Sequence, residues 1–169
     1  AGGFRRGRRT HTAAVPDDDA ARRSRLADLV LDRGWRVACA ESVTAGLVAD
    51  ELAKAPQASD WFLGGVVAYA TEVKVRLLGV EDGPVVNQET AEQMARGVAE
   101  LMRAQVAVAT TGVGGPDPQE GQEAGTVWVG VHVDGTTTSH RLHVPGDPED
   151  VCTGAAQRAL QLLDEHLPG

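Results

Sequence analysis

The stretch WRVACAESVTAGLVADELAKAP, residues 35–56, decides the fold. Residues 35–40 form a short apolar run of the kind that makes a buried strand, and the polar turn 41–46 follows it directly. Apolar side chains then recur at helical spacing over 47–56. A buried strand that passes through a short polar turn into a helix is the building unit of α/β proteins.

The same alternation continues on both sides of this stretch. A helix that opens on acidic residues is predicted before it, from Pro16 to Gly34. Downstream, buried strands and helices take turns: a strand over 61–70, a helix over 72–78, a helix over 87–103 capped by Asn87, a strand over 105–110 and a last helix over 149–167.

The dipeptide Asp134-Gly135 separates two extended runs, 127–133 and 136–144, and is the strongest hairpin signal in the chain. Strands that alternate with helices favour parallel pairing, whereas a hairpin adds antiparallel strands. The sequence therefore predicts a three-layer α/β/α sandwich with a mixed, mostly parallel sheet and one C-terminal antiparallel hairpin.

Composition predicts one domain over residues 16–169, preceded by a basic arm over 1–15 that we expect to be disordered. Residues 1–12 carry four arginines and no acid, so the rest of the chain holds 12 basic against 24 acidic side chains. An acidic body repels phosphate backbones and anionic lipid, so we expect neither nucleic acid nor a membrane as a partner.

The same composition also bears on where in the cell the protein is expected. No run approaches the roughly 18 apolar residues of a membrane-spanning helix, and no charged and then apolar leader opens the chain. The two cysteines, Cys39 and Cys152, form no CxxC pair, which suits a reducing environment. We therefore expect a cytoplasmic protein.

Three polar segments, 41–46, 69–74 and 111–116, each follow a predicted buried strand. Because the carboxyl ends of parallel strands meet at one edge of a sheet, ligands of α/β proteins bind there. We expect the three segments to converge on one site.

A lysine stands out in this set, because only two of the sixteen basic side chains are lysines and one of them is Lys74. A partly buried lysine can lose its proton, which an arginine cannot, and a neutral amine can accept the proton of a serine hydroxyl. Ser42 supplies the hydroxyl, and Tyr69, the only tyrosine, is placed to relay or orient the proton. The residues alone leave open that Ser42 and Thr44 merely cap a helix and that Tyr69 is a surface residue.

Other constellations predict no site. Pairing across the hairpin puts His132 opposite Thr137 and His140 on the other face, so the histidines of this region predict no metal site. The glycine-rich loop 111–116 lacks the GK[ST] ending of a triphosphate-binding loop and does not match G-x-G-x-x-G. The loop 116–125 that follows it is expected to be mobile.

Five motifs resemble the C-terminal domain of the CinA (competence/damage-inducible) family, which includes the nicotinamide-nucleotide amidases. Residues 40–46, AESVTAG, are similar to the family signature AESCTGG, and residues 64–74, GGVVAYATEVK, to GGxVxYSNExK. Residues 111–116, TGVGGP, are similar to TGIAGP, and the later GTVW of 125–128 and PGD of 145–147 also match.

The resemblance covers about residues 20–167 and implies hydrolysis of the carboxamide of nicotinamide mononucleotide to nicotinic acid mononucleotide and ammonia. It assigns catalysis to Ser42 as nucleophile, Lys74 as proton acceptor and Tyr69 as the group that links them, with backbone amides near Thr44 holding the oxyanion. It implies no metal and no organic cofactor. The substrate-binding residues that follow from it are Glu41, Thr44, Gly46, Thr71, Thr111, Gly112 and Gly114, the last three facing the ribose phosphate.

The sequence also departs from the family pattern. Val43 and Ala45 replace a cysteine and a glycine, and Ala70-Thr71 replaces Ser-Asn. Pro148 and Cys152 stand where the family usually has arginines, which removes two cations that could meet a phosphate.

These departures keep other classes of function open. One alternative is a nucleotide-binding or regulatory domain without catalysis, and another is a competence- or recombination-associated module in which the basic arm takes part. In the enzymatic interpretation we expect a pyridine mononucleotide as small-molecule partner and a homo-oligomeric assembly.

Overall fold

The computed structural model describes residues 18–169. The predicted disordered arm over 1–15 and the first residues of the first predicted helix lie outside them. The described elements, in chain order, are α1 (Asp18–Asp32), β1 (Val37–Glu41), α2 (Leu47–Ala53), α3 (Ala58–Trp61), β2 (Phe62–Val67), α4 (Thr71–Leu78), α5 (Gln88–Met102), β3 (Val106–Gly112), β4 (Thr126–Val133), β5 (Thr136–His143) and α6 (Pro148–His166).

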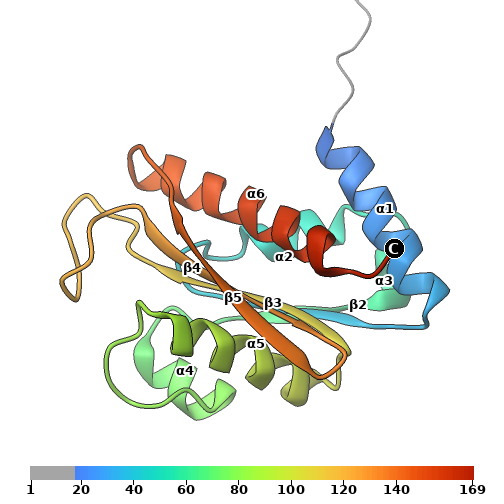
Figure 1. Cartoon of the computed structure of the whole chain (residues 1–169), viewed down its shortest axis with the longest axis horizontal. Helices are drawn as coiled ribbons and strands as arrows, with labels where there is room; N and C mark the ends of the chain where they lie inside the picture. Colours follow the sequence, from blue (N-terminus) through green and yellow to red (C-terminus); the bar gives the residue numbers. More distant parts are fainter. Residues whose placement is uncertain (1–17) are drawn as a thin grey trace, which may run out of the picture.

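The five strands form one mixed sheet in the order β2-β1-β3-β4-β5. β1 lies between β2 and β3 and is parallel to both, and β3, β4 and β5 pair antiparallel. The hairpin register is the predicted one, with His132 opposite Thr137. Helices cover both faces, α1, α2, α3 and α6 on one and α4 and α5 on the other (Figure 1). The predicted fold class is confirmed.

The neighbouring strands β1 and β3 alternate large and small side chains, and this alternation sets how closely the helices pack on each face of the sheet. Their valines and Cys39 point to the face of α1, α2 and α6, where they form the larger apolar cluster. The alanines at 38, 40, 107 and 109 point to the other face, against α5. Because successive side chains of a strand alternate between faces, the alanine side lets α5 pack closely on the sheet.

Helix α5 also packs closely against α4, which carries Lys74. A Cβ atom at Gly97 would collide with the carbonyl oxygen of Leu78, so only glycine fits at this crossing. The start of α5 is the predicted one, because the side chain of Asn87 accepts a hydrogen bond from the backbone N–H of Thr90 at 2.8 Å.

The predicted second strand, 61–70, is shorter in the structure, where β2 covers Phe62–Val67. Trp61 does not begin the second strand but ends the short helix α3, where it is buried and its indole N–H donates to the carbonyl oxygen of Pro56 at 3.0 Å. A buried indole needs an acceptor, and the α3 turn supplies one that an extended chain would not.

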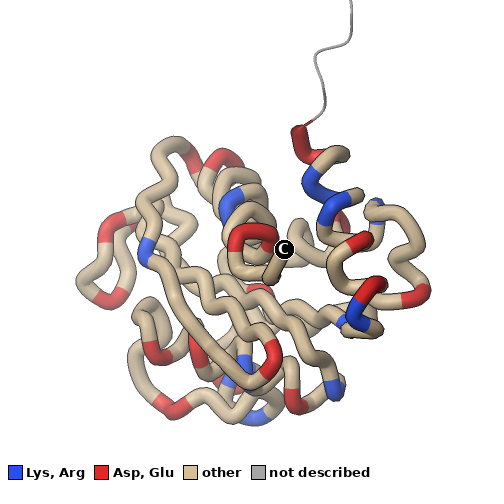
Figure 2. The backbone as a smooth tube through the Cα atoms, turned by 45° about the vertical axis from the view of Figure 1, so that its right-hand side comes forward, with Lys and Arg blue, Asp and Glu red and all other residues tan. Residues whose placement is uncertain are grey.

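Basic and acidic residues are interspersed along the helices and loops of the body (Figure 2). Within residues 18–169 no helix combines the length and the apolar character needed to cross a bilayer.

We expect Gly97→Ala to lower the free energy of unfolding by about 1–3 kcal/mol, because overpacking at the α4–α5 crossing outweighs the higher helix propensity of alanine. Urea unfolding followed by circular dichroism measures this. The matched control is Glu100→Ala, an exposed position on the same helix, which should change the free energy by less than about 0.5 kcal/mol. A Gly97→Ala protein as stable as the wild type would contradict the close crossing.

Candidate active site

The three polar segments predicted to converge do lie together, around a cavity of about 500 Å³ at the carboxyl ends of β1, β2 and β3. Its lining includes Ser42, Tyr69 and Lys74, one from each of two loops and one from α4. The remaining lining residues come from the loop after β1, the start of α4, the segment before α5, the end of β3 with the loop that follows it, and the start of α6: Val43, Ala45, Thr71, Val85, Val86, Thr111, Gly112, Val113, Gly114, Gly115, Pro116, Asp117, Pro118, Gln119, Pro148 and Cys152.

Ser42 is the first residue after β1. Its backbone N–H donates to the carbonyl oxygen of Thr110 at 3.0 Å, which ties it to the end of β3. Only 8% of its surface is exposed, yet its hydroxyl makes no hydrogen bond to any described residue. Because every buried polar side-chain atom of the described chain has a partner, this unpartnered hydroxyl faces the cavity.

Lys74 lies one turn into α4 and is 1% exposed. Its Nζ donates to the carbonyl oxygen of Tyr69 at 3.0 Å. Burial lowers the pKa of the Lys74 amine from its ordinary value, and the negative charge of Glu120 acts in the opposite direction. Lys74 and Ser42 line one cavity but form no direct hydrogen bond. A proton could pass between them only through a bridging group or after the two side chains move closer together.

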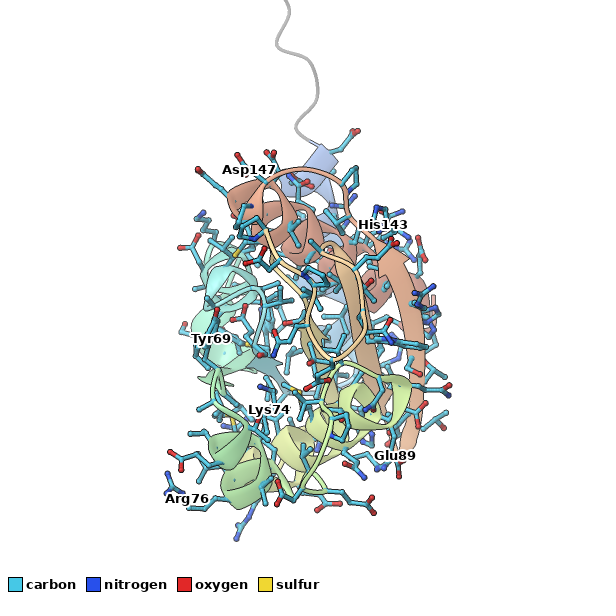
Figure 3. The ribbon with its side chains drawn as sticks, turned by 90° about the vertical axis from the view of Figure 1, so that its left-hand side faces the viewer. Tyr69, Lys74, Arg76, Glu89, His143 and Asp147 are labelled. Atoms are coloured by element: carbon cyan, nitrogen blue, oxygen red, sulfur yellow. The ribbon has the colours of Figure 1, made fainter. Side chains whose placement is uncertain are left out.

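Tyr69 contributes in two different ways. Its main-chain carbonyl holds the lysine, while its side chain is 72% exposed and lies at the rim. Figure 3 shows Tyr69 at the outer edge and Lys74 further inside. A phenol at the rim can close over a bound ligand.

Glu41 and Thr44 lie beneath the cavity and do not line it. The buried Glu41 carboxylate accepts hydrogen bonds from the backbone N–H groups of Val48 at 2.8 Å and Ala49 at 3.0 Å and from the Thr44 hydroxyl at 2.6 Å. The Thr44 hydroxyl also meets that of Thr110 at 2.8 Å. This geometry gives both residues a supporting role and does not favour the substrate contact predicted for them.

The same contacts limit which amides near the start of α2 remain for an anion. The helix α2 begins at Leu47, where the predicted helical pattern also begins, after Gly46 has turned the chain with a φ of 108°. Glu41 already occupies the first free amides of α2. The amides that remain for an oxyanion are those of Val43 and Thr44, which donate to no acceptor among the described residues.

The glycine-rich loop after β3 forms one wall. Gly112 and Gly114 line the cavity, as does Thr71 at the start of α4, whereas Gly46 does not. Thr111 is buried, and its hydroxyl donates to the carbonyl oxygen of Val85 at 2.7 Å. These contacts leave the backbone of the loop, more than its side chains, to face a ligand.

Glu120 is a residue that the sequence reasoning missed. Its carboxylate accepts hydrogen bonds from the backbone N–H groups of Val85 at 2.9 Å and Val86 at 2.8 Å. It therefore ties the loop 116–125, expected to be mobile, to the segment that precedes α5. Glu120 is one of three acids in this glycine- and proline-rich loop, with Asp117 and Glu123, so no sequence signal singled it out as the clamp.

Among residues 18–169 no group of three or more His, Cys, Asp and Glu side chains is arranged to hold a metal ion. Nδ1 of His132 and the Thr137 hydroxyl are hydrogen-bonded at 2.8 Å. His140 and His166 meet at 3.1 Å between their Nε2 atoms, far along the sheet from the cavity lining.

Solved structures of similar proteins share this architecture. The competence damage-inducible protein A from Klebsiella pneumoniae is 32% identical, with a TM-score of 0.83, and the match covers 88% of this chain and 96% of that one. The competence-damaged protein (CinA) superfamily protein from Enterobacter cloacae is 28% identical, with a TM-score of 0.85, and covers 98% of this chain and all of its own.

Proteins of similar sequence carry names from the same family as these solved structures. A CinA-like protein from Frankia casuarinae is 41% identical over 146 residues, which are 83% of this chain and 34% of that protein. The chain thus spans about a third of the length of the curated relatives it matches. A family model described as the CinA C-terminal domain matches residues 19–167. The chain therefore belongs to the CinA C-terminal domain family.

Proposed function

We propose that this domain is an amidohydrolase that cleaves the carboxamide of a pyridine nucleotide and releases ammonia, with nicotinamide mononucleotide as the substrate that the resemblance implies. The observation that carries the proposal is the pair of Ser42 and Lys74 in one cavity. The serine hydroxyl faces this cavity and has no hydrogen-bond partner among the described residues, and burial lowers the pKa of the lysine amine.

In the first half of the reaction, Oγ of Ser42 attacks the carboxamide carbon while the neutral amine of Lys74 takes the hydroxyl proton. Tyr69 or one water bridges the two groups, since no direct hydrogen bond joins them. The oxygen of the tetrahedral intermediate becomes negative, and the free N–H groups of Val43 and Thr44 stabilise it. The C–N bond then breaks, and the leaving nitrogen takes the proton from Lys74 and departs as ammonia.

In the second half, water attacks the ester formed on Ser42 and Lys74 accepts a proton from that water. The ester bond breaks, the acid leaves, and the proton returns to the serine oxygen. The lysine is neutral at the start of each half and again at the end, so the cycle is balanced. The tether to the Tyr69 carbonyl holds the amine in place in both charge states, since an amine and an ammonium group can each donate a hydrogen bond.

A second candidate is a ligand-binding domain without catalysis. The missing hydrogen bond between Ser42 and Lys74 favours it. Such a domain would bind a nucleotide in the same cavity and release no ammonia.

The first test is ammonia release from nicotinamide mononucleotide. We expect Ser42→Ala to abolish it and Lys74→Arg to lower it by roughly 10²–10⁴-fold, because a guanidinium group cannot act as a base at neutral pH. The matched control is Lys54→Arg, because Lys54 is exposed and paired with Asp50 and Glu51 on the surface. Activity that survives in folded Ser42→Ala protein would rule the mechanism out, and binding without turnover in the wild type would select the second candidate.

The pH dependence provides a second test. Lys74 acts in its neutral form, so the rate should rise with pH as the amine loses its proton. Because the charge of Glu120 raises the pKa of Lys74, Glu120→Gln should lower that pKa and shift the rising limb of kcat/KM to lower pH. Glu123→Gln removes the same charge from an exposed position of the same loop and should leave the limb in place. A shift in the opposite direction, or equal shifts in the two variants, would disprove this role.

A further inference from the structure

We infer that the cavity selects a carboxamide carried on a cationic, unphosphorylated pyridine nucleoside over the corresponding 5′-phosphate. This inference rests on the proposed function for the position of the carboxamide, at Ser42 and Lys74. It concerns the part of the cavity lining formed by Pro148 and Cys152 from the start of α6 and by Asp117 from the loop after β3.

The first turn of α6 would ordinarily offer free amides to an anion, but here a capping box takes those of Asp147 and Asp150. Asp147 caps the helix and accepts from the N–H of Asp150 at 2.9 Å, while the Asp150 carboxylate accepts from the N–H of Asp147 at 3.1 Å. Pro148, which faces the cavity, has no N–H at all. Asp147 and Asp150 therefore satisfy each other's amides, and the residue of this turn that lines the cavity, Pro148, offers a phosphate no donor.

One turn further, Cys152 offers no positive charge either. Its Sγ donates to the carbonyl oxygen of Thr44 at 3.3 Å, and burial raises the pKa of the thiol, so the group stays neutral. The thiol fills the place on the wall from which a longer cationic side chain could reach a ligand.

The charges of the lining complete the argument. Among the described residues that line the cavity, Lys74 is the sole cationic side chain and Asp117 the sole acidic one. Lys74 must be neutral to act as a base, so the working cavity carries a net negative charge. Arg76, the other basic residue of α4, is exposed, and Figure 3 shows it at the outer end of the helix, away from Asp147.

A nucleoside with a pyridinium ring suits this cavity better than its phosphate. Its positive charge is attracted by Asp117 and by the acidic start of α6, and a positive charge near Lys74 favours the neutral amine. Its ribose hydroxyls need only neutral partners, which Thr71 and Gln119 in the lining supply. A phosphate would lose its hydration and gain no countercharge.

The direct test compares N-ribosylnicotinamide with nicotinamide mononucleotide as substrates of the full chain. We expect kcat/KM for the nucleoside to exceed that for the mononucleotide by about tenfold or more, a difference near 1.4 kcal/mol. A preference for the mononucleotide of the same size would overturn the inference and leave the hydrolase proposal intact.

Adding a cation to the wall should weaken or abolish the preference for the nucleoside. We expect Cys152→Arg, and independently Pro148→Arg, to raise the ratio of mononucleotide to nucleoside kcat/KM by about tenfold, the effect of one charge-assisted hydrogen bond. The matched control is Thr153→Arg, an exposed neighbour on α6 outside the cavity, which should leave the ratio unchanged. Equal changes in all three variants would mean that the net charge of the protein, and not this wall, sets the preference.

Calorimetric binding to Ser42→Ala protein separates this inference from the proposed function. If the wild type releases ammonia from neither compound while Ser42→Ala protein binds the nucleoside more tightly, the inference stands and the hydrolase proposal fails. Tighter binding of the mononucleotide contradicts the inference whatever the turnover. Binding of neither compound contradicts both.

Discussion

The buried carboxylate of Glu41 is the interaction on which the site depends. A carboxylate that is 1% exposed is costly unless hydrogen-bond donors surround it, and here two backbone amides of α2 and the Thr44 hydroxyl do so. Through Thr44 it also reaches Thr110 at the end of β3. One side chain therefore joins the end of β1, the start of α2 and the end of β3, and Ser42 occupies the short turn between these fixed points.

The second constraint is the alternation of large and small residues along β1 and β3. The alanine face lets α5 lie close to the sheet, and Gly97 lets α4 lie close to α5. Lys74 therefore becomes buried without any acidic partner in hydrogen-bonding contact. A lysine on a helix held further out would be hydrated and protonated, so the chemistry of the amine follows from the packing of residues that never touch a ligand.

The features that depend on residues close together along the chain could be predicted from the sequence. The alternation of strands and helices, the Asn87 cap and the Asp134-Gly135 hairpin all follow from local pattern, and the convergence of three loops follows from parallel pairing. The contacts of Glu41 and Glu120 could not be predicted in this way. Glu120 binds amides 34 and 35 residues away, and Glu41 binds amides of α2 that lie seven and eight residues further along the chain. Trp61 was misplaced because its need for an acceptor depends on burial, which only tertiary structure reveals.

The hydrogen bond from Lys74 to residue 69 has a consequence for substitutions there, because the acceptor is a main-chain oxygen. Every amino acid carries that oxygen, so the anchor of the lysine persists under any substitution at this position that preserves the backbone. Substitution at the rim can therefore change the side chain that meets a ligand while the amine of Lys74 keeps its location. At position 69 the main chain anchors the lysine independently of the phenol.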